Sequence, residues 1–288
     1  MKIKENIRSM TIQEREREFK FTFDDFNFLR KLSNEYSGIQ VPDERFDMFY
    51  SRLSKRVRRL GFTNFKEYCQ YLKDNPELEF TDFINAITTN LTAFFRENHH
   101  FEYLRDHVIP ELLIRNSYTR RIRVWSAGCS TGEEPYSIAM TLLENIPANW
   151  DIKILATDLD TAVLKSASEG IYTEERVAGI SDDRLKHWFM RGKSTQSGQV
   201  RVSPQLQNII CFKQLNLIQE WPMKGQFDFI FCRNVLIYFD RETKIMLAKR
   251  YAHILAERSW LFIGHSESLN QLSTELELVA CTSYRKNK

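Results

Sequence analysis

The chain has 288 residues, of which 42% are hydrophobic and 13% aromatic, so it can bury one large core or two smaller ones. This composition excludes a disordered or fibrous protein. The formal net charge of +3 is close to balance. Any attraction to an acidic partner must therefore come from a local patch of charge.

The cysteines and the N-terminus bear on where the protein works. The five cysteines are scattered and include no C-x-x-C pair, which argues against a disulfide framework and against a zinc site. The tail at 1–20 is charged and contains no signal-like apolar run, and no segment approaches the ~18 apolar residues of a membrane span. We expect a cytoplasmic protein with no metal and no membrane-inserted segment.

The first third of the chain is expected to be helical. From about residue 23 to residue 90, apolar residues recur at spacings of three and four, and Gly38 and Gly61 stand where helices would end. No strand pattern occurs there. We assign residues 21–90 to a helical domain that follows the charged tail.

One expected helix carries a basic stripe. In "DMFYSRLSKRVRRLG" (47–61), Leu53, Val57 and Leu60 share one side, and another side, opposite the apolar one, carries the basic stripe, defined as Arg52, Lys55, Arg56 and Arg59. A solvated face is the usual explanation. Nucleic acid is disfavoured, because the stripe lacks interleaved aromatics and the isoelectric point of about 8.5 is modest.

After this domain the sequence pattern changes to short apolar runs between helical segments, at 121–127, 151–158, 227–234 and 259–267. Strands that alternate with helices predict a parallel α/β sheet. Between the second and third runs, 198–203 and 208–217 are extended and predict a small antiparallel insertion, placed at about 190–215. The extended segment 275–286 favours a hairpin-like ending.

"WSAGCSTGEEPY" (125–136) has two interpretations. Residues 128–132 match the hydrolase elbow G-x-S-x-G, which would make Ser130 a nucleophile, but they also suit a glycine loop that holds a nucleotide-like cofactor. An elbow lies in mid-sheet after several strands, whereas only helical sequence precedes 121–127. We therefore favour a cofactor loop after the first strand.

An acidic residue follows the second expected strand. Asp158 ends the run 151–158, about 25 residues after the glycine loop, where a carboxylate would accept hydrogen bonds from both ribose hydroxyls. Asp160 competes for that role, and either residue would also serve as a turn residue or a helix cap. The loop lacks the G-x-G-x-x-G spacing of a dinucleotide site.

Four motifs in order, "NAITTNLTAFFRE", "WSAGCSTGEEPYSIA", "ATDLD" and "FCRNVLIYFD", resemble the chemotaxis receptor methyltransferase family, CheR, over about residues 22–284. The resemblance implies a small all-helical N-terminal domain and then, at 91–288, a class I S-adenosylmethionine-dependent methyltransferase domain, Rossmann-like, with a seven-stranded sheet and a small antiparallel β insertion. Such enzymes methylate receptor glutamates, so the resemblance implies S-adenosylmethionine as cofactor and S-adenosylhomocysteine as product.

The glycine loop would face the methionine part of the cofactor. Pro135 suits the first position of a helix, which places Glu134 at or near the N-cap. By resemblance, Glu134 meets the cofactor's amino group, with Glu133 as the fallback; both carboxylates would also favour the helix dipole. Gly128 and Gly132 would let the backbone approach the ligand.

The resemblance assigns further residues to the site. It places Asn90, Thr92 and Arg96 in the cofactor pocket, Asn216 and Leu217 near the adenine, and Arg233, Asn234 and Tyr238 in the segment that faces the transferred methyl. Arg96 would grip a carboxylate, unless it forms only an interdomain salt bridge. Tyr238 would orient the substrate carboxylate, or else be a core tyrosine. Arg233 and Asn234 would contact the cofactor or support its loop.

The expected chemistry needs no general base, because a glutamate is already ionised at neutral pH. His265, His99 and His100 are accordingly interpreted as structural. The expected partners are receptors. The basic stripe would steer docking to their cytoplasmic helical region, and their C-terminal tail is the alternative contact. We expect a monomer. A non-catalytic, cofactor-binding protein that docks on receptors is the alternative.

Overall fold

The computed structural model describes residues 17–270 and 272–287. Most of the predicted charged tail, residues 1–16, lies outside the described residues. Internal contacts divide the chain into two units, one of residues 1–31 and 42–87 and the other of residues 32–41 and 88–288. The turn after the first helix therefore belongs to the second unit.

The N-terminal elements are helices, as predicted, and no strand occurs between residues 17 and 90. Gly61 ends the second helix with φ 78°, and Gly38 follows the first with φ 73°, both in the left-handed region that favours glycine. Buried aromatic rings, including Phe49, Phe65 and Phe83, form much of the core. The elements are α1 (Phe23–Ser37), η1 (Asp43–Arg45), α2 (Phe46–Leu60), α3 (Phe65–Asp74) and α4 (Pro76–Ile87).

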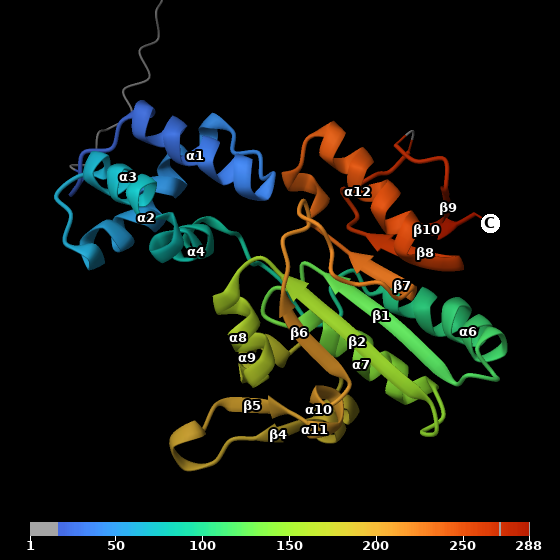
Figure 1. The fold of residues 1–288 in the computed structure, drawn as a ribbon. Coiled ribbons are helices and arrows are strands. Elements are labelled where there is room, and N and C mark those ends of the chain that lie inside the picture. The colour runs from blue at the N-terminus through green and yellow to red at the C-terminus, as the bar shows by residue number, and fades with distance from the viewer. Residues whose placement is uncertain (1–16, 271, 288) are drawn as a thin grey trace, which may run out of the picture. The chain divides into compact units, whose positions relative to one another are not determined.

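The second unit is built on a seven-stranded sheet in the order β6-β2-β1-β7-β8-β10-β9 (Figure 1). Strands β1, β2, β6, β7 and β8 run parallel, and β10 is antiparallel to both neighbours. The expected runs 121–127 and 151–158 coincide with β1 and β2. The strands are β1 (Arg121–Ala127), β2 (Asp151–Asp158), β6 (Ile210–Gln214), β7 (Phe227–Cys232), β8 (Leu255–Ile263), β9 (Leu276–Ala280) and β10 (Ser283–Lys286).

Helices cover both faces of this sheet, which explains why the later residues of β1 and β7 are buried without alternation. Val124 and Phe231 pack with α7 residues on one face, whereas Trp125 and Ile230 pack with α12 residues on the other. The helices of this unit are α5 (His99–Tyr103), the π-helix η2 (Leu104–Val108), α6 (Ile109–Arg115), α7 (Glu133–Asn145), α8 (Thr161–Glu169), α9 (Glu174–Val177), α10 (Asp182–Trp188), η3 (Ser194–Gln196), α11 (Pro204–Gln207), η4 (Leu236–Tyr238) and α12 (Arg241–Ile254).

The small antiparallel sheet exists, but its composition differs from the prediction. It has the order β3-β5-β4, from β3 (Ile171–Thr173), β5 (Gln199–Val202) and β4 (Phe189–Arg191), so it begins before residue 190. The extended segment 208–217, expected in this insertion, instead forms β6 and pairs in parallel with β2. The reason is that local sequence fixes an extended conformation but not the strand with which it pairs.

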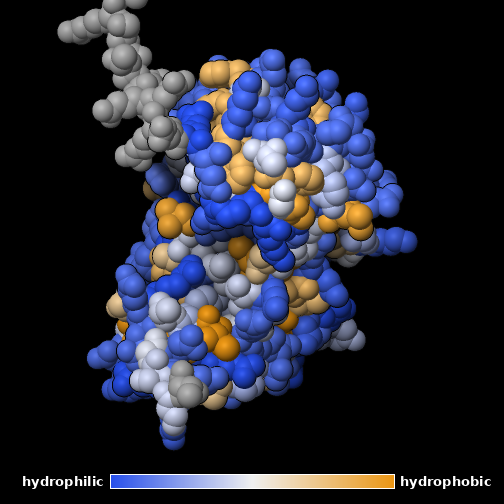
Figure 2. Space-filling view, turned by 90° about the vertical axis from the view of Figure 1, so that its left-hand side faces the viewer, coloured by the Kyte–Doolittle hydropathy of each residue, from blue (hydrophilic) through white to orange (hydrophobic). Residues whose placement is uncertain are grey.

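The C-terminal segment, expected as one extended segment in a hairpin with the preceding run, is divided into β9 and β10, which form a hairpin with each other, and only β10 pairs antiparallel with β8. Cys281 and Thr282 turn the chain between β9 and β10, and Thr282 has a positive φ of 47°. None of the helices in the described part of the chain combines the length and apolar character needed to cross a membrane. The face shown in Figure 2 is mostly hydrophilic, with apolar side chains in small separate groups.

Candidate functional site

The candidate site lies where β1, β2 and β7 end. These three strands are parallel neighbours, so their carboxyl ends share one edge of the sheet. The glycine loop (residues 128–132) follows β1, Asp158 ends β2, and Arg233 follows β7. Open α/β sheets bind ligands at this edge.

The backbone of the glycine loop requires its glycines. Gly128 has φ 89°, and a Cβ there would lie 2.3 Å from Cγ2 of Val235. Gly132 has φ 98° and is the N-cap of α7. The helix therefore begins at Glu133, so Pro135 is its third residue and not its first, and Glu134 is its second residue and not its N-cap. A left-handed glycine starts the helix earlier than the proline indicated.

Ser130 holds the loop, and none of its hydrogen-bond partners among the described residues would activate it. Its Oγ donates a hydrogen bond to the carbonyl oxygen of Asn90 (2.9 Å), and its backbone N–H donates to Asp158 (2.8 Å). Its φ of 48° is left-handed. A nucleophilic serine needs a neighbouring base, which these contacts do not supply. The geometry supports the cofactor-loop interpretation.

The two aspartates after β2 have different surroundings. Asp158 accepts hydrogen bonds from the N–H groups of Ser130 (2.8 Å) and Asp160 (3.0 Å). Burial nevertheless raises the pKa of Asp158 to about 6. Asp160 caps α8 by accepting from Ala162 N–H (2.8 Å) and also accepts from Asn90 (2.8 Å). Asp160 is thus occupied as a helix cap.

Hydrogen bonds join the segment 90–97 to the residues that follow β1, β2 and β7. Asn90 bonds Asp160 through its side chain and Ser130 through its carbonyl. Arg96 donates from Nη1 to the carbonyl oxygen of Leu91 (2.9 Å), while its own carbonyl accepts from Arg233. Thr92 lies half-buried between them.

Arg233 lies between two enclosed carboxylates. Its guanidinium is 3.3 Å from Glu134 and 3.3 Å from Glu97. The Glu134 side chain also accepts from Ser126 Oγ (2.7 Å). Burial raises the pKa of Glu134 despite these partners, whereas hydrogen bonds from His265 and the charge of Arg233 outweigh burial and lower the pKa of Glu97 to about 2. Two carboxylates thus share one buried cation.

A further carboxylate, Glu267, holds the loop after β7. It accepts hydrogen bonds from the backbone N–H groups of Asn234 (2.9 Å), Ile237 (3.1 Å) and Gly264 (2.5 Å). A Cβ on Gly264 would lie 2.4 Å from Nδ2 of Asn234. The side chain of Asn234 donates to Glu97 (3.4 Å). The conformation of the loop that leads to Tyr238 therefore depends on Glu267.

Asn216 and Tyr238 are both held by residues 36–40. The Asn216 amide donates to the Tyr36 carbonyl (2.6 Å), and the Tyr238 carbonyl accepts from Gln40 N–H (2.7 Å). A Cβ on Gly38 would lie 2.9 Å from Ile218, which explains the glycine. Leu217 is buried beside Asn216. The Tyr238 side chain is half-buried, and its hydroxyl forms no hydrogen bond with the described residues.

The contacts connect most of the predicted site residues. One chain of hydrogen bonds and ion pairs joins Asn90, Ser130 and Asp158, and a second joins Arg96, Glu134, Arg233 and Asn234. Asn216, Leu217 and Tyr238 do not contact either chain directly through the bonds described. Glu97 and Glu267 were missed by sequence reasoning. Their only sequence signals were their positions within "FFRE" and "GHSE".

The histidines have surroundings that suit structural roles. His100 is buried and contacts Thr282 Oγ1 (2.9 Å), and burial lowers its pKa to about 3. His265 is exposed and contacts Glu97 (2.8 Å). Glu97, His99 and His100 offer ligand atoms within 4.8 Å of one another. Because Arg233 already pairs with Glu97, its charge opposes a metal ion there.

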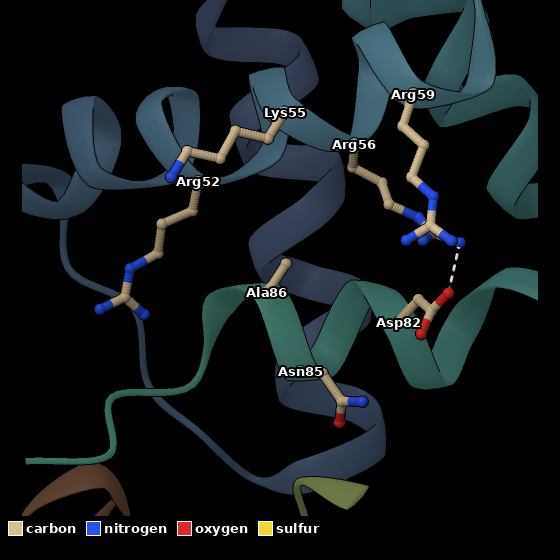
Figure 3. A pocket seen from close by; sticks show the side chains of 7 residues that line it. All are labelled: Arg52, Lys55, Arg56, Arg59, Asp82, Asn85 and Ala86. Atoms are coloured by element: carbon tan, nitrogen blue, oxygen red, sulfur yellow. Dashed lines mark ion pairs between the residues drawn. The ribbon is translucent and has the colours of Figure 1, made fainter. Parts of the chain in front are cut away.

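The basic stripe surrounds a hollow of about 390 Å³ between α2 and α4, lined also by Asp82, Asn85 and Ala86 (Figure 3). Its members differ in exposure. Lys55 and Arg59 are exposed, but Arg56 bonds the buried carboxylate of Glu79 and pairs with Asp82, the ion pair dashed in Figure 3. The expectation that the whole stripe lies away from the core is therefore wrong for Arg56.

Arg52 also contributes to the structure of this domain. Its Nη1 donates to the carbonyl oxygen of Ile87, at the end of α4 (2.8 Å). Four cations at helical spacing thus divide into two that tie α2 to α4 and two that face solvent. Sequence spacing alone does not separate these pairs, because only the packed partner decides which side chain is enclosed.

Known proteins resemble this sequence over most of its length. Residues 24–88 match the model of the CheR methyltransferase all-alpha domain, and residues 90–285 match that of the CheR methyltransferase SAM binding domain. The chain is 42% identical over 268 residues to the chemotaxis protein methyltransferase of Escherichia coli, covering 91% of each chain. It is 42% identical over 253 residues to a probable chemotaxis protein methyltransferase of Rhizobium etli, covering 86% of this chain and 94% of that one. The chain therefore belongs to the CheR family of S-adenosylmethionine-dependent methyltransferases.

Proposed function

We propose that this protein transfers a methyl group from S-adenosylmethionine to glutamate side chains of chemotaxis receptors, in the cytoplasm. The family supports the receptor as substrate, since relatives at 40–42% identity carry the name chemotaxis protein methyltransferase. The observation that carries the proposal is the enclosed cluster at the carboxyl edge of the sheet, where Glu134 and Glu97 share Arg233.

The charge of this cluster fits the cofactor. With Glu134 and Glu97 ionised, His265 neutral and Arg233 as the arginine that both contact among the described residues, the cluster carries one negative charge in excess, and Asp158 adds another on the neighbouring strand. S-adenosylmethionine supplies an electrophilic methyl on a positively charged sulfur and also carries an ammonium group. Buried negative charge stabilises a cationic ligand more than it would in water.

Each residue then has a physical role in binding. Asp158 accepts hydrogen bonds from the ribose hydroxyls and Glu134 from the ammonium group. We choose Glu134 over Glu133 because Glu134 belongs to the cluster around Arg233 at the carboxyl edge of the sheet, whereas Glu133 pairs with Arg176 of the inserted segment. Gly128 lets the backbone approach, and Asn216 and Leu217 contact the adenine. Asn90, Thr92, Arg96, Arg233 and Asn234 complete the pocket. Arg233, enclosed between its carboxylates, acts by holding them and the 90–97 segment.

Methyl transfer itself requires alignment and little else. The substrate glutamate is ionised at neutral pH, so no residue needs to remove a proton. The free hydroxyl of Tyr238 donates a hydrogen bond to one carboxylate oxygen, and Arg96 neutralises its charge during approach. Enclosure of the pocket excludes water from the in-line path.

The substrate test uses membranes that contain a candidate receptor and cofactor with a labelled methyl group. We expect label to enter the receptor as an ester that base releases as methanol. A receptor with its glutamates replaced by glutamine is the control and should remain unlabelled. Docking on receptors without ester formation would favour the alternative, a non-catalytic regulator, and label that resists base would contradict the glutamate assignment.

Tyr238→Phe tests the substrate-facing role. Loss of one hydrogen bond to an ionised carboxylate should lower kcat by about 10- to 100-fold and leave the Kd for S-adenosylmethionine unchanged. Tyr118→Phe is the matched control, because Tyr118 is 98% exposed. Equal activities of the two variants would remove Tyr238 from the mechanism.

The docking surface is proposed to be the exposed half of the basic stripe, Lys55 and Arg59, acting by electrostatic attraction to an acidic region of the receptor. Reversing both to Glu should slow methylation of intact receptors by about 3- to 10-fold at low salt, with the difference shrinking near 0.15 M, where screening shortens the reach of charges to about 8 Å. The control reverses Lys66 and Lys73, which are exposed on α3. Equal rates for both double variants would place docking elsewhere.

A further inference from the structure

The inserted segment between β2 and β6 contacts the glycine loop directly. The hydroxyl of Tyr172, on β3, donates a hydrogen bond to the backbone carbonyl of Thr131 (2.7 Å). Arg176, on α9, donates to Thr131 Oγ1 (2.9 Å) and forms an ion pair with Glu133. Three contacts from β3 and α9 thus converge on Thr131 and Glu133, the two residues that flank Gly132 at the start of α7.

The ion pair with Arg176 fixes the position of the Glu133 side chain. The Glu133 side chain is fully buried, and Arg176 is its ion-pair partner among the described residues. Its other oxygen accepts from Thr131 Oγ1 (2.7 Å). A buried carboxylate without a cation is costly, so loss of Arg176 would force the start of α7 to shift.

The loop has little room to absorb such a shift. At Gly132, which has φ 98°, a Cβ would lie 2.8 Å from the Tyr172 hydroxyl and 2.9 Å from the Ala167 side chain. On its other side, the loop is held by Asp158 through the N–H of Ser130. The loop is therefore clamped between β2 and the inserted segment, and movement on one side changes its position relative to the other.

We infer that Arg176, with Tyr172, is a positioning residue for S-adenosylmethionine. Arg176 pairs with Glu133, which fixes the first turn of α7, and that turn places Glu134 and the N–H groups of the glycine loop at the cofactor. The inserted segment thereby sets cofactor affinity from outside the pocket. The inference concerns cofactor binding alone and does not depend on which substrate is methylated.

Titration calorimetry of S-adenosylmethionine with the full chain tests this inference. Arg176→Gln should raise the Kd roughly 2- to 30-fold, the range typical of residues that act on a ligand through others. Arg176→Lys keeps a cation near Glu133 and should restore part of the affinity. Glu133→Gln removes the charge that needs Arg176, so adding Arg176→Gln to it should change the Kd less than in the wild type.

The matched control is Arg115→Gln, which removes an ion pair of similar enclosure. Arg115 pairs with Asp228 (2.7 Å) near the start of β7, at the opposite edge of the sheet from the glycine loop. It should lower thermal stability while leaving the Kd within about 2-fold. An unchanged Kd in Arg176→Gln, or an equal rise in Arg115→Gln, would overturn the inference, the second because it would show only general destabilisation.

Discussion

The two domains each place one arginine between two carboxylates, with different consequences. In the helical domain, Arg56 lies between Glu79, which is buried, and Asp82, whose side chain is 48% exposed. In the methyltransferase domain, Arg233 lies between Glu134 and Glu97, each only 10% exposed. In the helical domain water compensates the excess negative charge, so these ion pairs serve to hold α2 against α4. In the methyltransferase domain the excess charge is enclosed and available to a cationic ligand.

Arg56→Glu should have the largest effect on stability, and it tests whether the Arg56 ion pairs hold α2 against α4. It places a third carboxylate beside Glu79 and Asp82, and breaking an enclosed pair typically costs about 3–5 kcal/mol. We expect the free energy of unfolding in urea to fall by that amount. Lys55→Glu, an exposed neighbour on the same helix, should change it by about 0.5 kcal/mol or less. Similar losses in the two variants would contradict the assigned difference in burial.

Asp158→Ala tests whether the carboxylate at the end of β2 binds the cofactor. Leaving the ribose hydroxyls without their charged acceptor should weaken S-adenosylmethionine binding by about 1.5–3 kcal/mol, as calorimetry would measure. Asp160→Ala should act mainly on stability, through loss of the α8 cap at a cost of about 1 kcal/mol. An unchanged Kd in Asp158→Ala would transfer the ribose role to Asp160.

The pH dependence of cofactor binding tests whether Asp158 binds in its ionised form. The pKa of Asp158 is raised to about 6 in the free protein, and the ionised form binds the hydroxyls, so affinity should rise with pH through that value. From pH 7.5 to pH 5 the Kd should increase about 10-fold, because only about a tenth of the carboxylate remains ionised. Asp158→Asn should show a smaller dependence, the remainder coming from Glu134. A flat wild-type profile would show that Asp158 does not bind as the anion.

Ser130→Ala should have the smallest effect. It removes one neutral hydrogen bond, to the carbonyl of Asn90, worth about 1 kcal/mol or less. Most methyltransferase activity should remain in a steady-state assay. Near-total loss of turnover with unchanged cofactor binding would restore the nucleophile interpretation of the loop.

The sequence predicted the strands and the motif positions well where local signals were strong. β1 and β2 match the expected runs because each is a short apolar run that lies between helical segments. The predicted start of α7 was two residues too late, because Pro135 is compatible with more than one position in the first turn. The left-handed conformation of Gly132 sets the start at Glu133. Glu97 and Glu267 carried no local signal, since their partners are distant in sequence.

By itself, the sequence determined the helical domain, the parallel sheet, the glycine loop and the family. These features depend on local periodicity, on turn residues and on motifs read in order. The tertiary structure decided that β6 pairs with β2 and that Arg56 is enclosed while Lys55 is exposed. It also decided that Arg176 reaches Glu133, 43 positions earlier in the chain. Strand partners and ion pairs are set by packing between segments far apart in sequence, which spacing along the chain does not encode.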